Sequence, residues 1–172
     1  MRTVLFVGML LLAVPAAGQE VAMADLQMAD GKVVLRATGA AFTGEMMHYH
    51  PDGAVSSRSA YVEGLRHGLD RDWDRNGHLR GERMWANDRR HGTDRVFDHN
   101  GKLLLETTWV DGAREGAVVW FYPEGGKRYE TAFAHGKRHG IWRQFAADGS
   151  LSMETEWDMG TLVRRHNPHA GH

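Results

Sequence analysis

Aromatic and aliphatic residues recur at fixed places within a unit of 24 residues that this chain repeats five times. Counted from the first residue of each unit, positions 6 and 18 are always aromatic, and position 12 is aliphatic in four units. Apolar and polar residues alternate between these positions, which is typical of β-strands. Since positions 6, 12 and 18 have the same parity, the pattern predicts that they share one face of a sheet. The aromatic residues are Tyr49, Trp73, Phe97, Phe121 and Phe145 at position 6, and Tyr61, Trp85, Trp109, Phe133 and Trp157 at position 18.

Glycine marks the start of every unit and the turns within it. Position 10 is always glycine and follows Asp or Asn in four units, which is a strong signal for a β-hairpin. Position 21 is glycine in four units and Asp88 in the other, and aspartate tolerates the left-handed backbone of a turn. The units therefore predict an elongated all-β meander of ten short antiparallel strands, in which each turn places position 6 opposite position 12. The first residues of the units are Gly44, Gly68, Gly92, Gly116 and Gly140.

The repeats occupy residues 44–163 and leave little room for another domain. Residues 1–18 are interpreted as a secretory signal peptide, because one basic residue precedes a short apolar run and small residues lead to Gly18, where we expect cleavage. The run has about eleven residues, too few to span a bilayer, so the chain is expected to be exported to the periplasm or secreted. Residues 19–43 are interpreted as an N-terminal segment with a degenerate capping repeat. Residues 164–172 are expected to form a disordered tail.

Composition narrows the classes of function. The chain has no cysteine, so packing and hydrogen bonds must stabilise it without disulfides. Its formal net charge is −1, which argues against nucleic-acid binding that depends on neutralising phosphates. The eleven histidines would make the net charge positive below about pH 6. We expect no cofactor and no membrane-spanning segment.

The hairpin glycine, the two aromatic positions and the closing Gly-x-x-x-Gly of residues 64–68 and 136–140 form a recognisable pattern. It resembles MORN repeats, in the bacterial variant found in proteins labelled YwqK-family antitoxins. The resemblance covers residues 44–163 and departs from the pattern at Asp88 and at residues 124–127. It implies a fold of stacked hairpins and a non-enzymatic interaction scaffold, in a family associated with protein dimerisation and lipid headgroups.

A basic dipeptide precedes the first glycine of several units. Since each unit supplies two strands, these residues would line one sheet edge at intervals of about 10 Å. Such an edge could bind an anionic surface, either lipid headgroups or an envelope polysaccharide. The alternative is a set of solvated turns whose charges protect the sheet edge from aggregation. The residues are Arg66, His67, Arg90, His91, Arg138 and His139, with Arg114 at the same place in the third unit.

A change of residue type in the last two units suggests a contact surface. Trp120 and Trp142 lie at odd positions, opposite in parity to the repeated aromatic residues, together with Val118. The corresponding region of the earlier units carries Asp70, Asp72 and Asp94 instead. Exposed tryptophans are typical of interfaces, so we predict that Val118, Trp120 and Trp142 bind a protein partner.

Catalytic and metal-binding residues are not predicted. The glutamates at position 15 share one repeated environment, whereas catalytic carboxylates need environments that separate their pKa values. Histidines two apart on a strand could share a metal, but no cysteine or carboxylate has a fixed spacing to them. The sequence thus predicts an exported, non-enzymatic scaffold for protein–protein interaction. The alternatives are a binder of anionic surfaces or an antitoxin-like neutralising partner. The glutamates are Glu82, Glu106, Glu130 and Glu154, and the histidines are His48 and His50, with His166, His169 and His172 spaced by three in the tail.

Overall fold

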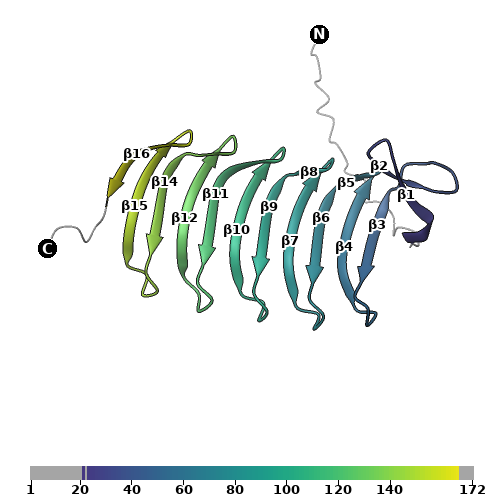
Figure 1. Ribbon diagram of the computed structural model, residues 1–172, viewed down its shortest axis with the longest axis horizontal. Helices are drawn as coiled ribbons and strands as arrows, with labels where there is room; N and C mark the ends of the chain where they lie inside the picture. The colour runs from purple at the N-terminus through teal and green to yellow at the C-terminus, as the bar shows by residue number, and fades with distance from the viewer. Residues whose placement is uncertain (1–20, 22, 167–172) are drawn as a thin grey trace, which may run out of the picture.

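The computed structural model describes residue 21 and residues 23–166 of the 172-residue chain. The predicted signal peptide, with its cleavage point at Gly18, lies outside the described residues, as do residues 167–172 of the expected tail. Strands account for most of the described chain, and those of the large sheet lie side by side, each running across the longest axis of the molecule (Figure 1). The prediction of an all-β antiparallel meander is confirmed.

The large sheet has 14 strands and keeps the order of the sequence throughout. Ten long strands form five hairpins, one for each unit, and short strands before three of the unit glycines extend the pairing. The hairpins are β3 (Gly44–Tyr49) with β4 (Val55–Val62), β6 (Gly68–Trp73) with β7 (Leu79–Ala86), β9 (Gly92–Phe97) with β10 (Leu103–Val110), β11 (Ala113–Phe121) with β12 (Lys127–Ala134), and β14 (Gly140–Phe145) with β15 (Leu151–Asp158). The short strands are β5 (Leu65–Arg66), β8 (Arg89–Arg90) and β13 (Lys137–Arg138).

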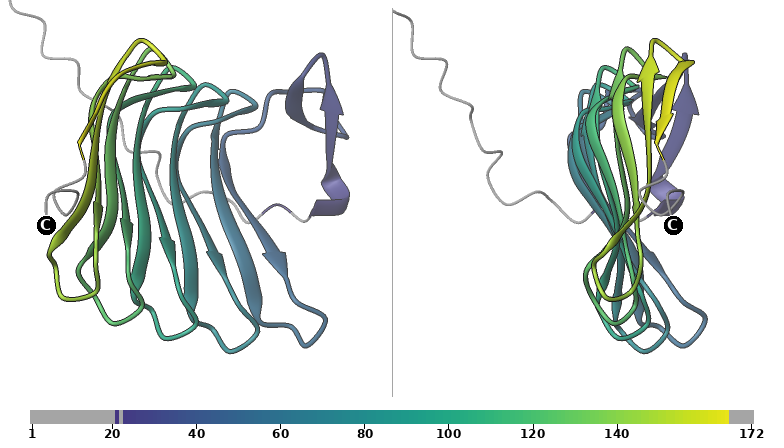
Figure 2. Two further views of the ribbon diagram at one scale, coloured as in Figure 1. Left: turned by 60° about the vertical axis from the view of Figure 1, so that its left-hand side comes forward. Right: turned by 90° about the vertical axis from the view of Figure 1, so that its left-hand side faces the viewer.

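The N-terminal segment forms a separate two-stranded hairpin at the first end of the sheet (Figure 2). A short 3-10 helix (Met23–Asp25) leads into β1 (Leu26–Ala29), which pairs with β2 (Lys32–Leu35). A small core joins this hairpin to the first unit. Its buried members are Leu26, Val33, Phe42 and Tyr61.

Gly64 connects this hairpin to the sheet by backbone hydrogen bonds. Its N–H donates to the Phe42 carbonyl at 2.8 Å, and its carbonyl accepts from the Val33 N–H at 2.9 Å. A Cβ atom at this position would lie 2.7 Å from the Val33 carbonyl oxygen, and the backbone has a φ of +81°. Only glycine satisfies both conditions, so the turn glycine of the first unit also sets the position of the N-terminal hairpin.

The last strand corrects the expected start of the tail. Residues 164–166 belong to β16 (Thr161–His166), which pairs with β15 from Asp158↔Thr161 to Glu154↔His166. The edge of β15 would otherwise offer unpaired backbone N–H and C=O groups, and the segment after the last turn pairs with them. These three residues are therefore strand and not disordered tail.

A β-bulge in every hairpin decides which side chains share a face. Position 6 pairs with position 12, as predicted, with Trp73 opposite Leu79. The register then shifts by one residue, so that Gly68 at position 1 pairs with Trp85 at position 18. Gly68 and Trp73 lie five residues apart on a regular strand and hence on opposite faces. The prediction that positions 6, 12 and 18 share a face is therefore wrong for position 18.

The sheet is a single layer with two different faces (Figure 2). One face carries positions 3, 5, 14, 16, 18 and 23 of each unit, and we call it the arginine–aromatic face. The other carries positions 2, 4, 6, 12, 15 and 17, and we call it the glutamate face. Between β6 and β15, no other element of the described chain covers either face. Side chains must therefore pack along each face, from one unit to the next.

Candidate functional site

A column of alternating arginines and aromatic rings runs along the arginine–aromatic face. Each arginine at position 23 pairs in register with the aromatic residue at position 18 and also contacts the ring of the next unit. The Arg90 guanidinium carbon lies 4.7 Å from the centre of the Trp85 ring and 5.7 Å from that of Trp109. Arg114 lies 5.4 Å from Trp109 and 5.3 Å from Phe133. Cation–π contacts thus link successive units.

The residue at position 3 determines whether an arginine of the column has a carboxylate near it. In the second and third units this residue is Asp70 or Asp94, four residues after Arg66 or Arg90. Arg90 donates to the Asp94 carboxylate. The pKa of Arg66 is raised chiefly by its hydrogen bond to the Tyr61 hydroxyl, and the charge of Asp70 adds to this. Both aspartates are more than nine-tenths buried, so they are held within the face.

The last two units lack this carboxylate. Val118 follows Arg114 and Trp142 follows Arg138 at the same spacing. Among the described residues, neither Arg114 nor Arg138 has a carboxylate within ion-pair distance. Their guanidinium groups remain beside aromatic rings without a compensating negative charge, which makes this part of the face chemically different from the first units.

Three aromatic rings gather on the same part of the face. The Trp120 ring meets the Tyr129 ring edge to face, with centres 6.4 Å apart and an angle of 84°. Tyr129 stacks on Trp142 at 5.7 Å and 20°. Register explains the contact, because Trp120 and Tyr129 are cross-strand partners in β11 and β12. All three residues are partly exposed, and we call them the aromatic patch.

The structure brings two of the three predicted partner-binding residues together. Trp120 and Trp142 both contact Tyr129, as described above. Val118 differs, because its side chain is only 1% exposed and cannot offer surface to a partner. It lies between Thr107 and Thr131 in the register and supports the patch from within the face. Sequence reasoning missed Tyr129, because only the bulge places position 14 beside position 5.

A pocket of about 310 Å³ adjoins the patch at the C-terminal end of the sheet. Arg138 lines it from β13 and lies 5.0 Å from the centre of the Trp157 ring. Arg165 lines it from β16 and contacts the sulfur of Met153. The last unit has Leu162 at position 23 in place of arginine, paired with Trp157. The lining residues are Arg138, Trp142, Met153, Thr155, Trp157, Leu162 and Arg165, and none of them is acidic.

The glutamate face has a different chemistry. Arg71 donates to Glu82 at 2.9 Å, and Arg95 lies between Glu82 at 3.8 Å and Glu106 at 2.9 Å. Arg143 similarly joins Glu130 and Glu154. Ion pairs therefore occupy the position-15 glutamates that sequence analysis considered as carboxylates for catalysis.

The arginines and histidines predicted as an anionic-binding edge do not lie together. The four arginines of this group, Arg66, Arg90, Arg114 and Arg138, belong to the column described above. His91 lies 3.4 Å from Asp111 of the next unit, and His139 lies 3.2 Å from Asp158. His67 is exposed. Adjacent strand residues point to opposite faces, so the two residue types separate.

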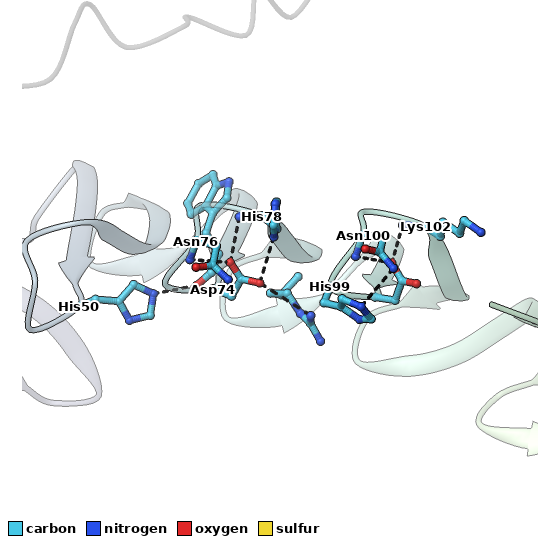
Figure 3. Close-up of polar contacts among 10 residues, drawn as sticks. His50, Asp74, Asn76, His78, His99, Asn100 and Lys102 are labelled. Carbon is cyan, nitrogen blue, oxygen red and sulfur yellow. Dashed lines mark hydrogen bonds and ion pairs between the residues drawn. The ribbon is translucent and has the colours of Figure 1, made fainter. Parts of the chain in front are cut away.

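The hairpin turns at the other edge use their polar groups in the fold (Figure 3). The Asp98 carboxylate accepts backbone N–H groups of Asn100 and Lys102 at 2.8 Å, and these bonds lower the pKa of Asp98. The His50 ring lies 3.0 Å from the Trp73 carbonyl oxygen. Among the residues that the structure describes, no group of three His, Cys, Asp or Glu side chains could hold a metal ion.

Two carboxylates on opposite faces predict opposite responses to pH. Burial raises the pKa of Asp70 above its usual value of 3.8, although Arg66 opposes the shift. Its contribution to stability is thus present below that value and lost as the pH rises through the pKa of the folded state. A hydrogen bond from Lys127 lowers the pKa of Glu130 below 4.5, so its contribution is lost as the pH falls.

We therefore expect the free energy of unfolding of Asp70→Asn to increase, relative to that of the unchanged protein, as the pH rises from about 3 to about 7. Glu130→Gln is the matched control, and its free energy of unfolding should decrease relative to that of the unchanged protein over the same range. Urea unfolding of the three proteins at several pH values measures both trends. Parallel trends for the two variants would contradict the assignment.

Comparisons with known proteins give no family for this chain. No family model matches, and no curated protein matches. A solved structure that is similar in part is a mutant of S. aureus TarM in complex with fondaparinux, alpha-GlcNAc-glycerol and UDP. It shares 13% sequence identity and a TM-score of 0.38, over 56% of this chain and 19% of that chain. No helix in the described residues has the length and hydropathy needed to cross a bilayer.

Proposed function

We propose that this protein is an exported, non-enzymatic repeat scaffold that binds a partner protein through the aromatic patch of its last two units. The observation that carries the proposal is the cluster of Trp120, Tyr129 and Trp142 on an uncovered sheet face. Tryptophan, tyrosine and arginine are the residues enriched at the energetic centres of protein interfaces, and arginines adjoin this cluster. The MORN-like sequence pattern points to the same class of function.

The geometry of the rings favours a protein over a stacked sugar or base. A stacking platform must present open ring faces to its ligand. Here Tyr129 turns one ring face toward Trp142, and Arg128 lies 5.0 Å from its ring centre. Trp120 also contacts Tyr129. The rings therefore offer edges and apolar sides, which suit the apolar side chains of a protein.

The non-enzymatic part of the proposal rests on how the repeats use their polar groups. The position-15 glutamates are held in ion pairs, and turn aspartates are held by backbone N–H groups. Catalysis needs a nucleophile, a base and an orienting group around one pocket. The pocket beside the patch contains arginine, aromatic and aliphatic side chains with one threonine, and it offers no base.

The test is a comparison of partner binding by matched variants. We expect Trp120→Ser with Trp142→Ser to reduce capture of the partner from the producing cells at least tenfold, because interface tryptophans contribute strongly to binding. Tyr49→Ser is the control, since Tyr49 is 59% exposed and lies on the glutamate face of the first unit. Quantitative mass spectrometry of the captured proteins measures the effect.

Circular dichroism must show that the double variant keeps its sheet. Equal capture by the double variant and the unchanged protein would overturn the proposal. Equal loss with Tyr49→Ser would also overturn it, because the contact surface would then not be the aromatic patch.

A further inference from the structure

We propose that the partner segment bound by the aromatic patch is acidic and extended, with carboxylates at every third residue. This inference rests on the proposed function and specifies the chemistry of its ligand. The carboxylates would pair with Arg114 and Arg138, and apolar residues between them would contact Trp120, Tyr129 and Trp142.

Four arginines without a carboxylate partner in the described chain lie around the patch. Arg114, Arg128, Arg138 and Arg165 have no carboxylate within ion-pair distance among the described residues, and all four are exposed. Arg90, by contrast, is paired with Asp94. In the fourth and fifth units no residue at the positions of the arginine–aromatic face is acidic. The glutamates of those units point to the other face, where arginines pair with them.

A difference between the units suggests that the charge of Arg114 and Arg138 serves ligand binding and is not needed for folding. The first four units each supply an arginine to the column for ring contacts, but the carboxylate at position 3 is present only in the second and third units. A guanidinium group beside aromatic rings forms strong, charge-assisted hydrogen bonds with an incoming carboxylate. The ring contacts also hold the side chain in place before binding.

Spacing along the face sets the pattern of the ligand. Arg114 and Arg138 are one unit apart, which is two strands or about 10 Å. A polyproline II segment rises about 3.1 Å per residue with three residues per turn, so every third side chain lies on one side about 9 Å apart. A segment of that conformation, laid across the strands, places successive carboxylates over successive arginines. The two residues between them supply the apolar contacts.

A lipid membrane fits this surface less well. Attraction to anionic lipids sums over many basic residues at the membrane surface, at about 1 kcal/mol for each. This chain has a net charge of −1, and its glutamate face and turns carry many carboxylates. Arg114 and Arg138 lie in a single row beside aromatic rings, and they do not form a broad basic surface. Peptide recognition is therefore the better match.

The experiment compares two synthetic peptides on the full chain. One contains four Glu-Pro-Leu units, and the other contains four Gln-Pro-Leu units. We expect the Glu peptide to bind at least tenfold more tightly at low salt, and the difference to shrink as salt increases. Isothermal titration calorimetry gives the affinities, and tryptophan fluorescence reports contact with the patch. Because only the peptide changes, this comparison does not depend on the folding of a variant.

Variants then locate the contact. Arg114→Gln and Arg138→Gln should each weaken the Glu peptide about tenfold and leave the Gln peptide unchanged. Val118→Asp should weaken it similarly, because it recreates the aspartate that pairs with Arg90 in the preceding unit. Arg75→Gln is the matched control, since Arg75 is an exposed arginine at a distant turn. It should bind both peptides as the unchanged protein does.

Each other outcome overturns the acidic-ligand proposal. Two of these outcomes concern the peptides, namely equal affinity for both or binding of neither. The others are equal effects of Arg75→Gln and Arg138→Gln, or binding to vesicles of phosphatidylcholine with phosphatidylserine that is tighter than binding to the Glu peptide. A Glu peptide with the same composition but clustered glutamates tests the three-residue spacing, and equal binding would overturn that part. The proposed function fails separately, when the tryptophan double variant captures its partner normally.

Discussion

Replacing Trp109 with alanine is expected to lower the free energy of unfolding by about 3 kcal/mol or more, as deletions of large packed aromatic residues do. The indole lies between Arg90 and Arg114, and its nitrogen is buried. Its loss removes packing in the third unit and the ring contacts of two neighbouring units. Urea unfolding followed by circular dichroism measures the change.

Tyr49→Ala serves as the comparison for this prediction. Tyr49 is also an aromatic residue of the repeat, but it is 59% exposed at one end of the sheet. Tyr49→Ala should lower the free energy of unfolding by less than about 1 kcal/mol, as is usual for surface changes. A similarly small loss for Trp109→Ala would contradict the role of the arginine–aromatic column in stability. Because units contact only their neighbours, Trp109→Ala should also broaden the unfolding transition.

The second large effect concerns Val118, whose side chain is 1% exposed. Val118→Lys is expected to lower the free energy of unfolding by at least about 3 kcal/mol, because it buries an unpaired charge near Arg114. Val118→Asp should be at least about 2 kcal/mol less damaging, since Arg114 can pair with it. The second and third units already hold a buried aspartate at this position.

Thermal and urea unfolding of the two variants test this difference. Val118→Ala is the control for the lost side-chain volume, and the expected order of stability places it above Val118→Lys. Equal stability of the lysine and aspartate variants would contradict the idea that Arg114 lacks only a carboxylate partner.

Much of the fold could be predicted from the sequence, because each unit carries its own turn signals. The pairing of position 6 with position 12 follows from the glycine at position 10, and Asp88 has the left-handed backbone, with a φ of 62°, that the glycine pattern implies. The assignment of faces failed because parity counting assumes regular strands. One extra residue in the second strand of each hairpin moves position 18 to the other face.

The candidate site could be predicted only in part for the same reason. Trp120 and Trp142 differ from the repeated residue types, so the sequence marks them as unusual. Tyr129 is their contact only because the bulge brings position 14 beside position 5. The exposure of Val118 could not be judged, since burial on a single-layer sheet depends on the size of neighbouring side chains. The ring contacts of the arginines likewise depend on which face they share.

The pairing of position 23 with position 3 of the next unit has a consequence for how such arrays diversify. A single substitution at position 3 determines whether the preceding arginine is neutralised or left available, and the hairpin that carries it needs no change in length or turn. Binding capacity can therefore shift from one unit to another during evolution while the backbone stays constant. In protein design, residues at the same position could be chosen unit by unit to set the distribution of charge along a sheet.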